Sequence, residues 1–471
     1  MMNLIELSTN KTWKLYIIGS LFGGLFLLIF LNQNNQGFSF SIARNTVQFP
    51  SLDEAIAPMS SFISASPKQS IFIPYTQPPI ASFIANFSSI PQEVQIKSST
   101  QLNYVENSNF LVNITKDVTN KTNIGTKSCN MFEGRWVYKP DESPSYDSIS
   151  CPFVEEKMSC QKNGRPDFEY EKWRWEANDC DIPLFNGIDM LERLRNKRVI
   201  IVGDSLNRNM WESLACLIYS SVPNSRAEVY NKNSQFYWLK AKDYNTIIEF
   251  HWSPFLIEYD VNHRSGKRVL ILDKLSPNFK QWQGADVMVF NSGHWWNHKG
   301  KFQKWDLIQY KGQLYDAMSV EQAYERGMKT WAKWVRKYVN PKKTTVFFRS
   351  ISAQHNGRKG CYNATQPTMD DSLINHFPKS LIDVIEKVIK GMTKSQVKYL
   401  NITKLSEYRI DSHPSVYRSS WKWKIYTTKY KSMIPSFADC SHWCLPGLPD
   451  TWNRLLYASL FFDTSRNMST F

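Results

Sequence analysis

The chain has 471 residues, a formal net charge of +15, and 42% hydrophobic residues. This length exceeds what one compact core needs and allows a folded domain with additional segments. The positive charge is compatible with an acidic partner, such as a uronate-bearing polysaccharide or an anionic membrane face, or with a plain basic surface. Lys and Arg form no long block and match no zinc-finger or RNA-binding signature, so we expect no nucleic-acid partner.

The N-terminal region contains one uncharged apolar run, LYIIGSLFGGLFLLIFL, at residues 15–31. At about 1.5 Å per residue, a helix of this length spans roughly 25 Å, enough for a thin bilayer. Lys11 and Lys14 precede the run and the next basic residue is Arg44, which places residues 1–14 in the cytosol by the positive-inside rule. We expect a transmembrane signal anchor; a cleaved signal peptide is the alternative.

The region beyond the anchor has the features of a lumenal protein. Glycosylation sequons occur at Asn86, Asn113, Asn120, Asn363, Asn401 and Asn467. The chain has eight cysteines, and an even number in an oxidising lumen predicts disulfides: Cys129, Cys151, Cys160, Cys180, Cys216, Cys361, Cys440 and Cys444. A zinc site at the last two is the alternative, but no second Cys or His pair completes it, so we expect no metal.

Two segments separate the anchor from the main domain. Residues 32–127 are rich in Ser, Asn, Gln, Thr and Pro without sustained periodicity, which predicts a disordered lumenal stem. Residues 128–181 are rich in Cys and Trp and are punctuated by Gly and Pro. This composition predicts a small disulfide-stapled lobe.

Residues 182–465 alternate between apolar runs typical of strands and amphipathic stretches typical of helices. This alternation predicts an α/β domain with a parallel sheet between helices. Strands are expected at 198–202, 246–257, 268–272, 286–290, 344–352 and 397–403, and helices at 209–219, 317–339 and 371–392.

A Gly-Asp-Ser sequence, residues 203–205, follows the first of these strands. Active sites of α/β sheets lie at the carboxyl ends of strands. Gly203 allows a sharp turn, Asp204 would stabilise the helix end, and free N–H groups there suit an alkoxide nucleophile and an acyl oxyanion at Ser205. The alternative is that Ser205 only caps the helix.

A second motif, DCSHWCLPGLPDTWN, occupies residues 439–453. Asp439 and His442 are close enough in sequence for the carboxylate to orient the imidazole, which would take the proton of Ser205. Disulfides at Cys440 and Cys444 would hold this loop in place. Metal binding or plain capping is the alternative interpretation.

These motifs, together with WRW…C and FNSGHWWNHKG, resemble those of the plant trichome birefringence-like family, from about Cys129 to about Leu460. The resemblance implies an SGNH (GDSL-type) hydrolase-like three-layer α/β/α sandwich. It also implies a single-pass type II protein of the Golgi membrane, with a lumenal catalytic domain that O-acetylates cell-wall polysaccharides.

Carried over residue by residue, the resemblance makes Ser205 the nucleophile, His442 the general base and Asp439 its orienting partner. Esterases of this fold place a glycine and an asparagine in the oxyanion hole. The candidates for oxyanion or substrate contacts are Gly203, Asp204, Arg208, Asn291, Gly293 and His294. Two alternatives stay open: Arg208 as a structural ion-pair partner, and Trp295 and Trp296 as buried rings rather than a sugar platform.

The expected reaction is transfer of an acetyl group through an acetyl-serine to a polysaccharide hydroxyl, with xylan or pectin as the preferred acceptor. The donor would be acetyl-CoA or an acetylated carrier. No bound cofactor is expected, because the chain has neither a P-loop nor a Rossmann fingerprint. The alternatives are a polysaccharide acetylesterase with the same triad and a non-catalytic wall-polysaccharide-binding protein.

Overall fold

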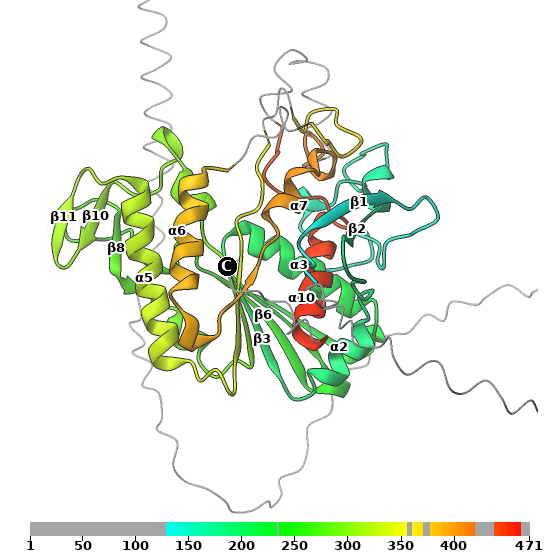
Figure 1. The fold of residues 1–471 in the computed structure, drawn as a ribbon, viewed down its shortest axis with the longest axis horizontal. Helices are drawn as coiled ribbons and strands as arrows, with labels where there is room; N and C mark the ends of the chain where they lie inside the picture. Colours follow the sequence, from blue (N-terminus) through cyan, green and yellow to red (C-terminus); the bar gives the residue numbers. More distant parts are fainter. Residues whose placement is uncertain (1–128, 233–234, 356–359, 371–376, 420–437, 463–471) are drawn as a thin grey trace, which may run out of the picture. The chain divides into compact units, whose positions relative to one another are not determined.

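The computed structural model describes residues 129–232, 235–355, 360–370, 377–419 and 438–462 (Figure 1). The expected cytosolic tail, anchor and stem therefore lie outside the described residues. Within the described ranges, every helix is too short or too polar to cross a membrane. All described residues belong to one compact unit, residues 108–471.

The centre of this unit is a seven-stranded sheet with the order β13-β12-β9-β3-β6-β5-β4. The strands from β13 to β6 pair in parallel, whereas β5 pairs antiparallel with both of its neighbours. The expected parallel sheet is thus wrong at one edge. The reason is physical: β4, β5 and β6 follow one another through connections too short for a crossover. The bounds are β3 (Arg198–Gly203), β4 (Ala227–Lys232), β5 (Phe236–Ala241), β6 (Thr246–Trp252), β9 (Val287–Phe290), β12 (Thr345–Arg349) and β13 (Lys398–Leu400).

Two smaller sheets complete the strands of the described region. A four-stranded sheet contains β7 (Ile257–Asp260), β8 (Val269–Leu275), β10 (Leu307–Tyr310) and β11 (Gln313–Tyr315), and a two-stranded sheet pairs β1 (Gly134–Tyr138) with β2 (Trp173–Ala177). The strand expected at 268–272 therefore lies outside the central sheet. The strand expected at 246–257 divides into β6 and β7, because Pro254 lacks an amide donor and Leu256 turns the chain with φ of 60°.

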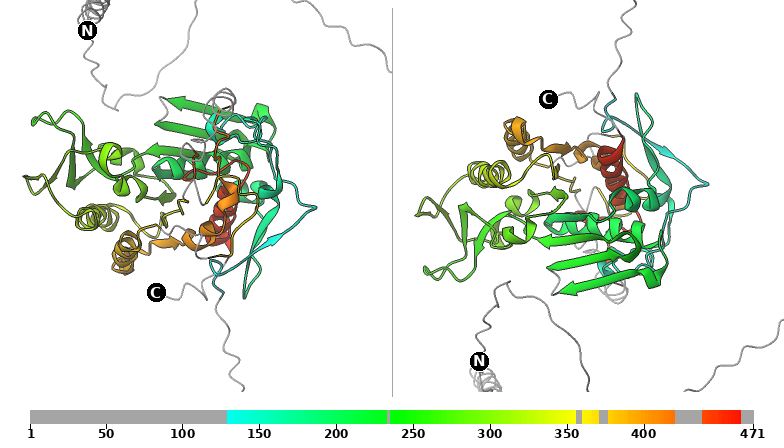
Figure 2. Two further views of the ribbon diagram at one scale, coloured as in Figure 1. Left: turned by 90° about the horizontal axis from the view of Figure 1, so that it is seen from above. Right: turned by 90° about the horizontal axis from the view of Figure 1, so that it is seen from below.

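Helices pack on both faces of the central sheet (Figures 1 and 2). Along β3, Val199 and Ile201 enter the core beneath α3, whereas Ile200 and Val202 enter the core beneath α5. The first core involves α2 (Gly187–Arg193), α3 (Ser205–Tyr219) and α10 (Leu448–Phe461); the second involves α4 (Phe279–Trp282), α5 (Val320–Tyr338) and α6 (Lys379–Lys390). The short helix α7 (Thr403–Glu407) follows β13. The helix expected at 371–392 begins later, at α6, and residues 371–376 are not described.

The N-terminal lobe packs directly against the larger α/β part; in Figure 2 its cyan strands lie beside the red helix α10. Trp136 Nε1 donates to the Leu405 carbonyl at 2.9 Å, and Tyr146 Oη donates to Asp450 at 2.8 Å. All eight cysteines form disulfides, as expected. Only Cys129–Cys180 lies within the lobe, whereas Cys151–Cys216 and Cys160–Cys444 join it to the α/β part. A segment this small cannot bury a sufficient core alone, so it shares one.

Asp450, in the first turn of α10, gives the fold a dependence on pH. Its carboxylate accepts bonds from the Gly447 N–H, Tyr146 and Ser213. Burial raises the pKa of Asp450 to about 6, above the unfolded value of about 3.9. Between these values the folded state holds more of the proton of this carboxyl than the unfolded state does, so the contribution of Asp450 to the free energy of unfolding falls as pH rises through this window.

We therefore expect Asp450→Asn to lose one component of the pH dependence of the thermal unfolding midpoint of the full chain: between about pH 4 and about pH 6, its midpoint should rise relative to that of the wild type as the pH rises. Differential scanning fluorimetry would measure both midpoints. Glu228→Gln, at an exposed carboxylate of β4, is the matched control and should keep the wild-type pH dependence. An unchanged pH dependence in Asp450→Asn would contradict the assignment.

Candidate active site

Ser205 is the first residue of α3, directly after the turn that follows β3. The buried apolar run of β3 ends at Gly203, and Asp204 is the N-cap of α3, with its side chain accepting the Leu206 N–H at 2.9 Å. Because Asp204 performs the capping, the Ser205 hydroxyl is not needed for it. Ser205 is half-buried at the carboxyl end of a parallel strand, the position at which α/β sheets place their sites.

The structure brings Ser205, His442 and Asp439 into one chain of hydrogen bonds. His442 Nε2 lies 2.8 Å from Ser205 Oγ, and His442 Nδ1 lies 2.9 Å from Asp439 Oδ2. Asp439 Oδ1 also accepts the N–H groups of Ser441 and His442, at 3.1 and 3.2 Å. The serine and the histidine are 237 residues apart in sequence, so this arrangement depends on the fold. Its geometry is that of a nucleophile, a base and an orienting carboxylate.

Asp439 is held ionised. Burial of its carboxyl opposes ionisation, but the interactions with His442 and with the Arg418 guanidinium outweigh burial, and the pKa of Asp439 lies well below its usual range. Arg418 Nε is 3.2 Å from Asp439 Oδ2. An ionised carboxylate at Nδ1 keeps the proton of a neutral imidazole on that nitrogen. Nε2 then faces Ser205 as an acceptor.

Covalent and hydrogen bonds fix the loop that carries His442. Cys361–Cys440 and Cys160–Cys444 hold it on both sides. Asn209 Oδ1 accepts the Trp443 N–H at 2.9 Å, and Asn209 Nδ2 donates to the Trp443 carbonyl at 3.3 Å. Asn209 and Ser205 are one helical turn apart on α3. The helix that presents the hydroxyl therefore also positions the residue next to the base.

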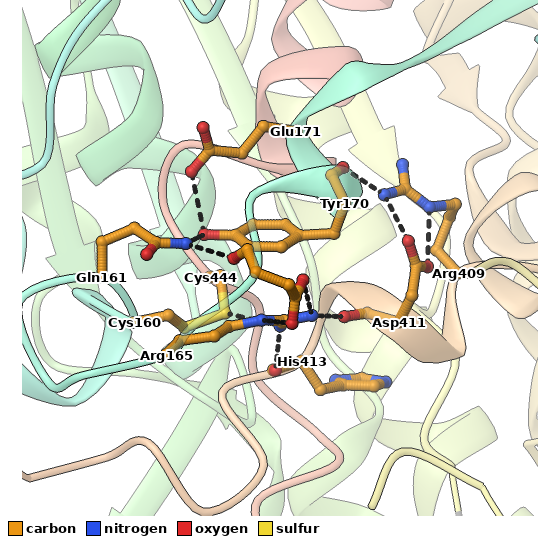
Figure 3. Close-up of polar contacts among 10 residues, drawn as sticks. Cys160, Gln161, Arg165, Tyr170, Glu171, Arg409, Asp411, His413 and Cys444 are labelled. Carbon is orange, nitrogen blue, oxygen red and sulfur yellow. Dashed lines mark hydrogen bonds and ion pairs between the residues drawn. A yellow bond between two sulfur atoms is a disulfide. The ribbon is translucent and has the colours of Figure 1, made fainter. Parts of the chain in front are cut away.

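The N-terminal lobe contributes a second support, shown in Figure 3. Arg165 donates to the carbonyls of Asp411 and His413, at 2.7 and 3.1 Å, and its guanidinium lies 3.9 Å from the ring centre of Tyr170. His413 Nδ1 in turn donates to the His442 carbonyl at 2.6 Å. Contacts thus run without interruption from the lobe to the backbone of the candidate base. Arg165 is a positioning residue because it touches no reacting atom.

Arg165→Lys is expected to lower kcat by about tenfold to a hundredfold, with little change in KM, because an ammonium cannot hold both carbonyls in the same geometry. Steady-state kinetics with an acyl-ester substrate would measure the change. Arg135→Lys, at an exposed position of β1, is the control. Equal effects of the two variants, or a change confined to KM, would contradict a positioning role.

Asn291 is the oxyanion candidate that the structure places beside the serine turn. Its Oδ1 accepts the Asp204 N–H at 3.2 Å. A Cβ on Gly203 would lie 2.1 Å from that oxygen, so only glycine permits this approach. Asn291 Nδ2 is buried and has no hydrogen-bond partner among the described residues. Asn291 directly follows β9 and lies beside Gly203, two residues before Ser205. Its amide is therefore an uncommitted donor next to the serine turn.

Gly293 and His294 have other surroundings. A Cβ on Gly293 would lie 2.7 Å from Ile351 Cδ1, so this glycine permits close packing. His294 Nε2 donates to the Ser352 carbonyl at 3.0 Å, and its ring packs against Phe377. Burial lowers the pKa of His294 to about 4. His294 is therefore held neutral with Nε2 committed to a backbone carbonyl, and its contact with the oxyanion or substrate stays a prediction.

Arg208 forms ion pairs. Its Nη1 lies 2.8 Å from Glu155 and its Nε 3.6 Å from Glu212. Burial, and next the charge of Glu155, raise the pKa of Glu212 to about 8. The structural alternative for Arg208 thus accounts for its contacts. Of the two tryptophans considered for sugar binding, Trp296 is fully buried, whereas Trp295 is half-buried.

Sequence reasoning missed Arg165, Asn209 and His413. Each acts through a backbone carbonyl or amide of a distant segment, for which a single sequence offers no pattern. The part of the chain described here also holds no group of three His, Cys, Asp or Glu residues arranged for a metal ion.

A strand-to-helix serine with a distant His-Asp pair defines a class of acyl-transfer domain. Residues 182–459 match the family model described as a GDSL/SGNH-like acyl-esterase family found in Pmr5 and Cas1p, and residues 127–181 match the PMR5 N-terminal domain. The first match implies an acyltransferase or an esterase.

Among similar proteins of Arabidopsis thaliana, the chain is 40% identical to protein trichome birefringence over 375 residues, which cover 76% of this chain and 60% of that protein. It is 41% identical to trichome birefringence-like 1 over 350 residues, 71% of this chain and 62% of that protein. It is 39% identical to trichome birefringence-like 4 over 402 residues, which cover 80% of this chain and 84% of that protein. The chain matches less than two thirds of the first two relatives, and it belongs to the trichome birefringence-like family.

Proposed function

We propose that the protein is an O-acetyltransferase that moves an acetyl group to a hydroxyl of a plant cell-wall polysaccharide. The hydrogen-bonded chain Ser205–His442–Asp439 carries the proposal, because it is built for a covalent acyl intermediate. The proposed acceptors are xylan or pectin. The proposed location is the Golgi membrane, through the segment 15–31, with residues 128–181 as a lobe and residues 182–465 as a lumenal catalytic domain.

In the first half-reaction, His442 Nε2 takes the proton of Ser205 as Oγ attacks the acetyl carbonyl. The tetrahedral oxyanion would be held by the N–H groups at the start of α3 and by Asn291 Nδ2. The bond to the donor's leaving group breaks, and the imidazolium returns the proton to that group. Asp439 stabilises the imidazolium throughout, and acetyl-serine remains.

In the second half-reaction, a sugar hydroxyl replaces the donor. His442 removes its proton, the sugar oxygen attacks the acetyl-serine carbonyl, and the Ser205 oxygen leaves and regains the proton. The sugar ester is the product. The acetyl donor, acetyl-CoA or an acetylated carrier, is a substrate rather than a resident cofactor.

An acetylesterase is the second candidate, favoured by the acyl-esterase description of the matching family. The two reactions share the first half and differ in whether water or a sugar hydroxyl attacks the acetyl-serine. Only the second half-reaction therefore distinguishes them.

The full chain, supplied with an acetyl donor and deacetylated xylan, pectin and mannan oligosaccharides, would test the proposal. Mass spectrometry would follow acetylated sugar, and a parallel assay would follow free acetate. Sugar ester exceeding acetate supports the transferase. Acetate without any sugar ester would establish the esterase. The absence of both products would favour a non-catalytic wall-binding protein.

A further inference from the structure

The outer half of the central sheet carries a groove that the proposed reaction does not use. Its volume is about 560 Å³, within the roughly 300–1,000 Å³ of ligand pockets. Helices α5 and α6 cover the central strands instead, where Trp331 packs on Phe290 and Phe348. The groove is lined by Arg198, Tyr230, Phe236, Glu249, His251 and Trp252, with three Asn and Gln residues beside them.

The floor of the groove is polar but internally neutralised. Glu249 and His251 alternate on β6, so both point to the groove face, and they are only 7% and 3% exposed. Arg198 binds both oxygens of Glu249 at 2.6 Å, and His251 Nε2 lies 2.7 Å from Glu249 Oε2. Although burial opposes ionisation, these partners keep the pKa of Glu249 below its usual value. The floor offers hydrogen-bonding groups without an unpaired charge.

The walls of the groove are aromatic. Tyr230 and Trp238 are cross-strand partners whose rings stack at 5.6 Å with 15° between their planes. Phe236 packs on the His251 ring at 4.8 Å. Tyr230 is 42% exposed, so part of its side chain is accessible to a ligand. Apolar ring faces beside neutral polar groups match a pyranose, which has apolar C–H faces and a rim of hydroxyls.

The groove begins close to Ser205. His251 pairs with Val202 and Trp252 pairs with Gly203 in the parallel register of β6 and β3, and neighbouring strands are about 4.8 Å apart. Trp252 borders the groove at the carboxyl end of β6. Its ring points to the opposite face of the strand from Glu249 and His251, where it lies 5.4 Å from Trp295 and 5.8 Å from the Arg208 guanidinium. The floor thus runs from Arg198, at the amino end of β3, past Glu249 to His251, and only its His251 end lies near the carboxyl edge that carries the serine turn.

We propose that this groove is a remote subsite that binds an uncharged pyranose segment of the acceptor polysaccharide, while a hydroxyl further along the chain reaches Ser205. The inference rests on the proposed function, since it names the acceptor of the same site. It assigns Tyr230 and Phe236 to ring stacking and the Arg198–Glu249–His251 cluster to hydroxyl contacts. The positive net charge is then not the determinant of binding at this subsite.

Binding is tested in the full chain carrying Ser205→Ala, so that no turnover occurs. Isothermal titration calorimetry would compare an uncharged β-1,4-linked disaccharide with the hexasaccharide of the same series. Tyr230→Ala should weaken hexasaccharide binding by roughly tenfold, the size of one lost stacking contact. Tyr230→Phe, which keeps the ring, should bind like the parent. Tyr338→Ala, at an aromatic residue 54% exposed on α5, is the control and should also bind like the parent.

Several results would overturn the proposal. One is equal hexasaccharide affinity with and without the Tyr230 ring, and another is a Tyr230-dependent preference for uronate-bearing oligomers over neutral ones of equal length. A Tyr230→Ala variant that changes oligomeric state in size-exclusion chromatography, without weakening glycan binding, would identify the groove as a contact between copies.

The two proposals fail separately. Tyr230-dependent hexasaccharide binding by a protein that transfers no acetyl group would support the groove and refute the acetyltransferase. Conversely, acetyl transfer whose KM for the hexasaccharide is the same in wild type and Tyr230→Ala would support the acetyltransferase and refute the groove.

Discussion

Ser205→Ala is expected to lower kcat for acetyl transfer by at least about 10⁴-fold, because a serine triad without its nucleophile retains only binding and oxyanion stabilisation. The variant should also fail to gain acetyl mass when mixed with the donor. Since Asp204 rather than Ser205 caps α3, the fold should survive the substitution.

Intact-protein mass spectrometry and steady-state kinetics would measure these effects, and peptide mapping would locate the acetyl group. Ser220→Ala, at the exposed C-terminal end of the same helix, is the matched control. Undiminished transfer by Ser205→Ala, or acetyl found on another residue of wild type, would refute the covalent mechanism.

Asp439→Asn is expected to lower kcat by about 10⁴-fold, the scale seen when a triad aspartate is made neutral. The amide would donate toward Nδ1 and so favour the tautomer whose proton lies on Nε2, facing Ser205 Oγ. The Asn side chain can still accept the N–H groups of Ser441 and His442, which the carboxylate accepts here. The loop should therefore keep its shape.

Measurements of kcat against pH, together with the thermal midpoint, would separate a chemical effect from unfolding. The lowered pKa of Asp439 keeps its carboxylate ionised at every pH at which the folded protein works. The plot of kcat against pH for the wild type should therefore show no change in rate caused by protonation of Asp439. A loss of less than about tenfold in Asp439→Asn would mean that the carboxylate does not orient His442.

The sequence alone was sufficient where local pattern and chemistry coincide. The apolar run of β3 followed by Gly-Asp-Ser predicts a strand-to-helix turn, and the structure has one. The contact between His442 and Ser205 was inferred from residue types and from the family resemblance, and the structure brings them to 2.8 Å. The number of cysteines predicted disulfides.

What the sequence did not reveal depends on long-range geometry. Eight cysteines allow 105 pairings, and the observed pairs connect segments that only the fold brings together. The contacts of Arg165 and His413 go to backbone carbonyls, which carry no residue-specific signal. The antiparallel edge of the sheet was missed because the strand pattern was interpreted as βα alternation, whereas β4, β5 and β6 form consecutive hairpins.

The disulfides between the lobe and the α/β part bear on how this protein can be divided. A polypeptide limited to residues 182–459 would leave Cys216 and Cys444 without their partners Cys151 and Cys160. Chimaeras that exchange only one of the two family segments would have to rebuild the same interface. An exchange of substrate preference between relatives should therefore transfer both segments together.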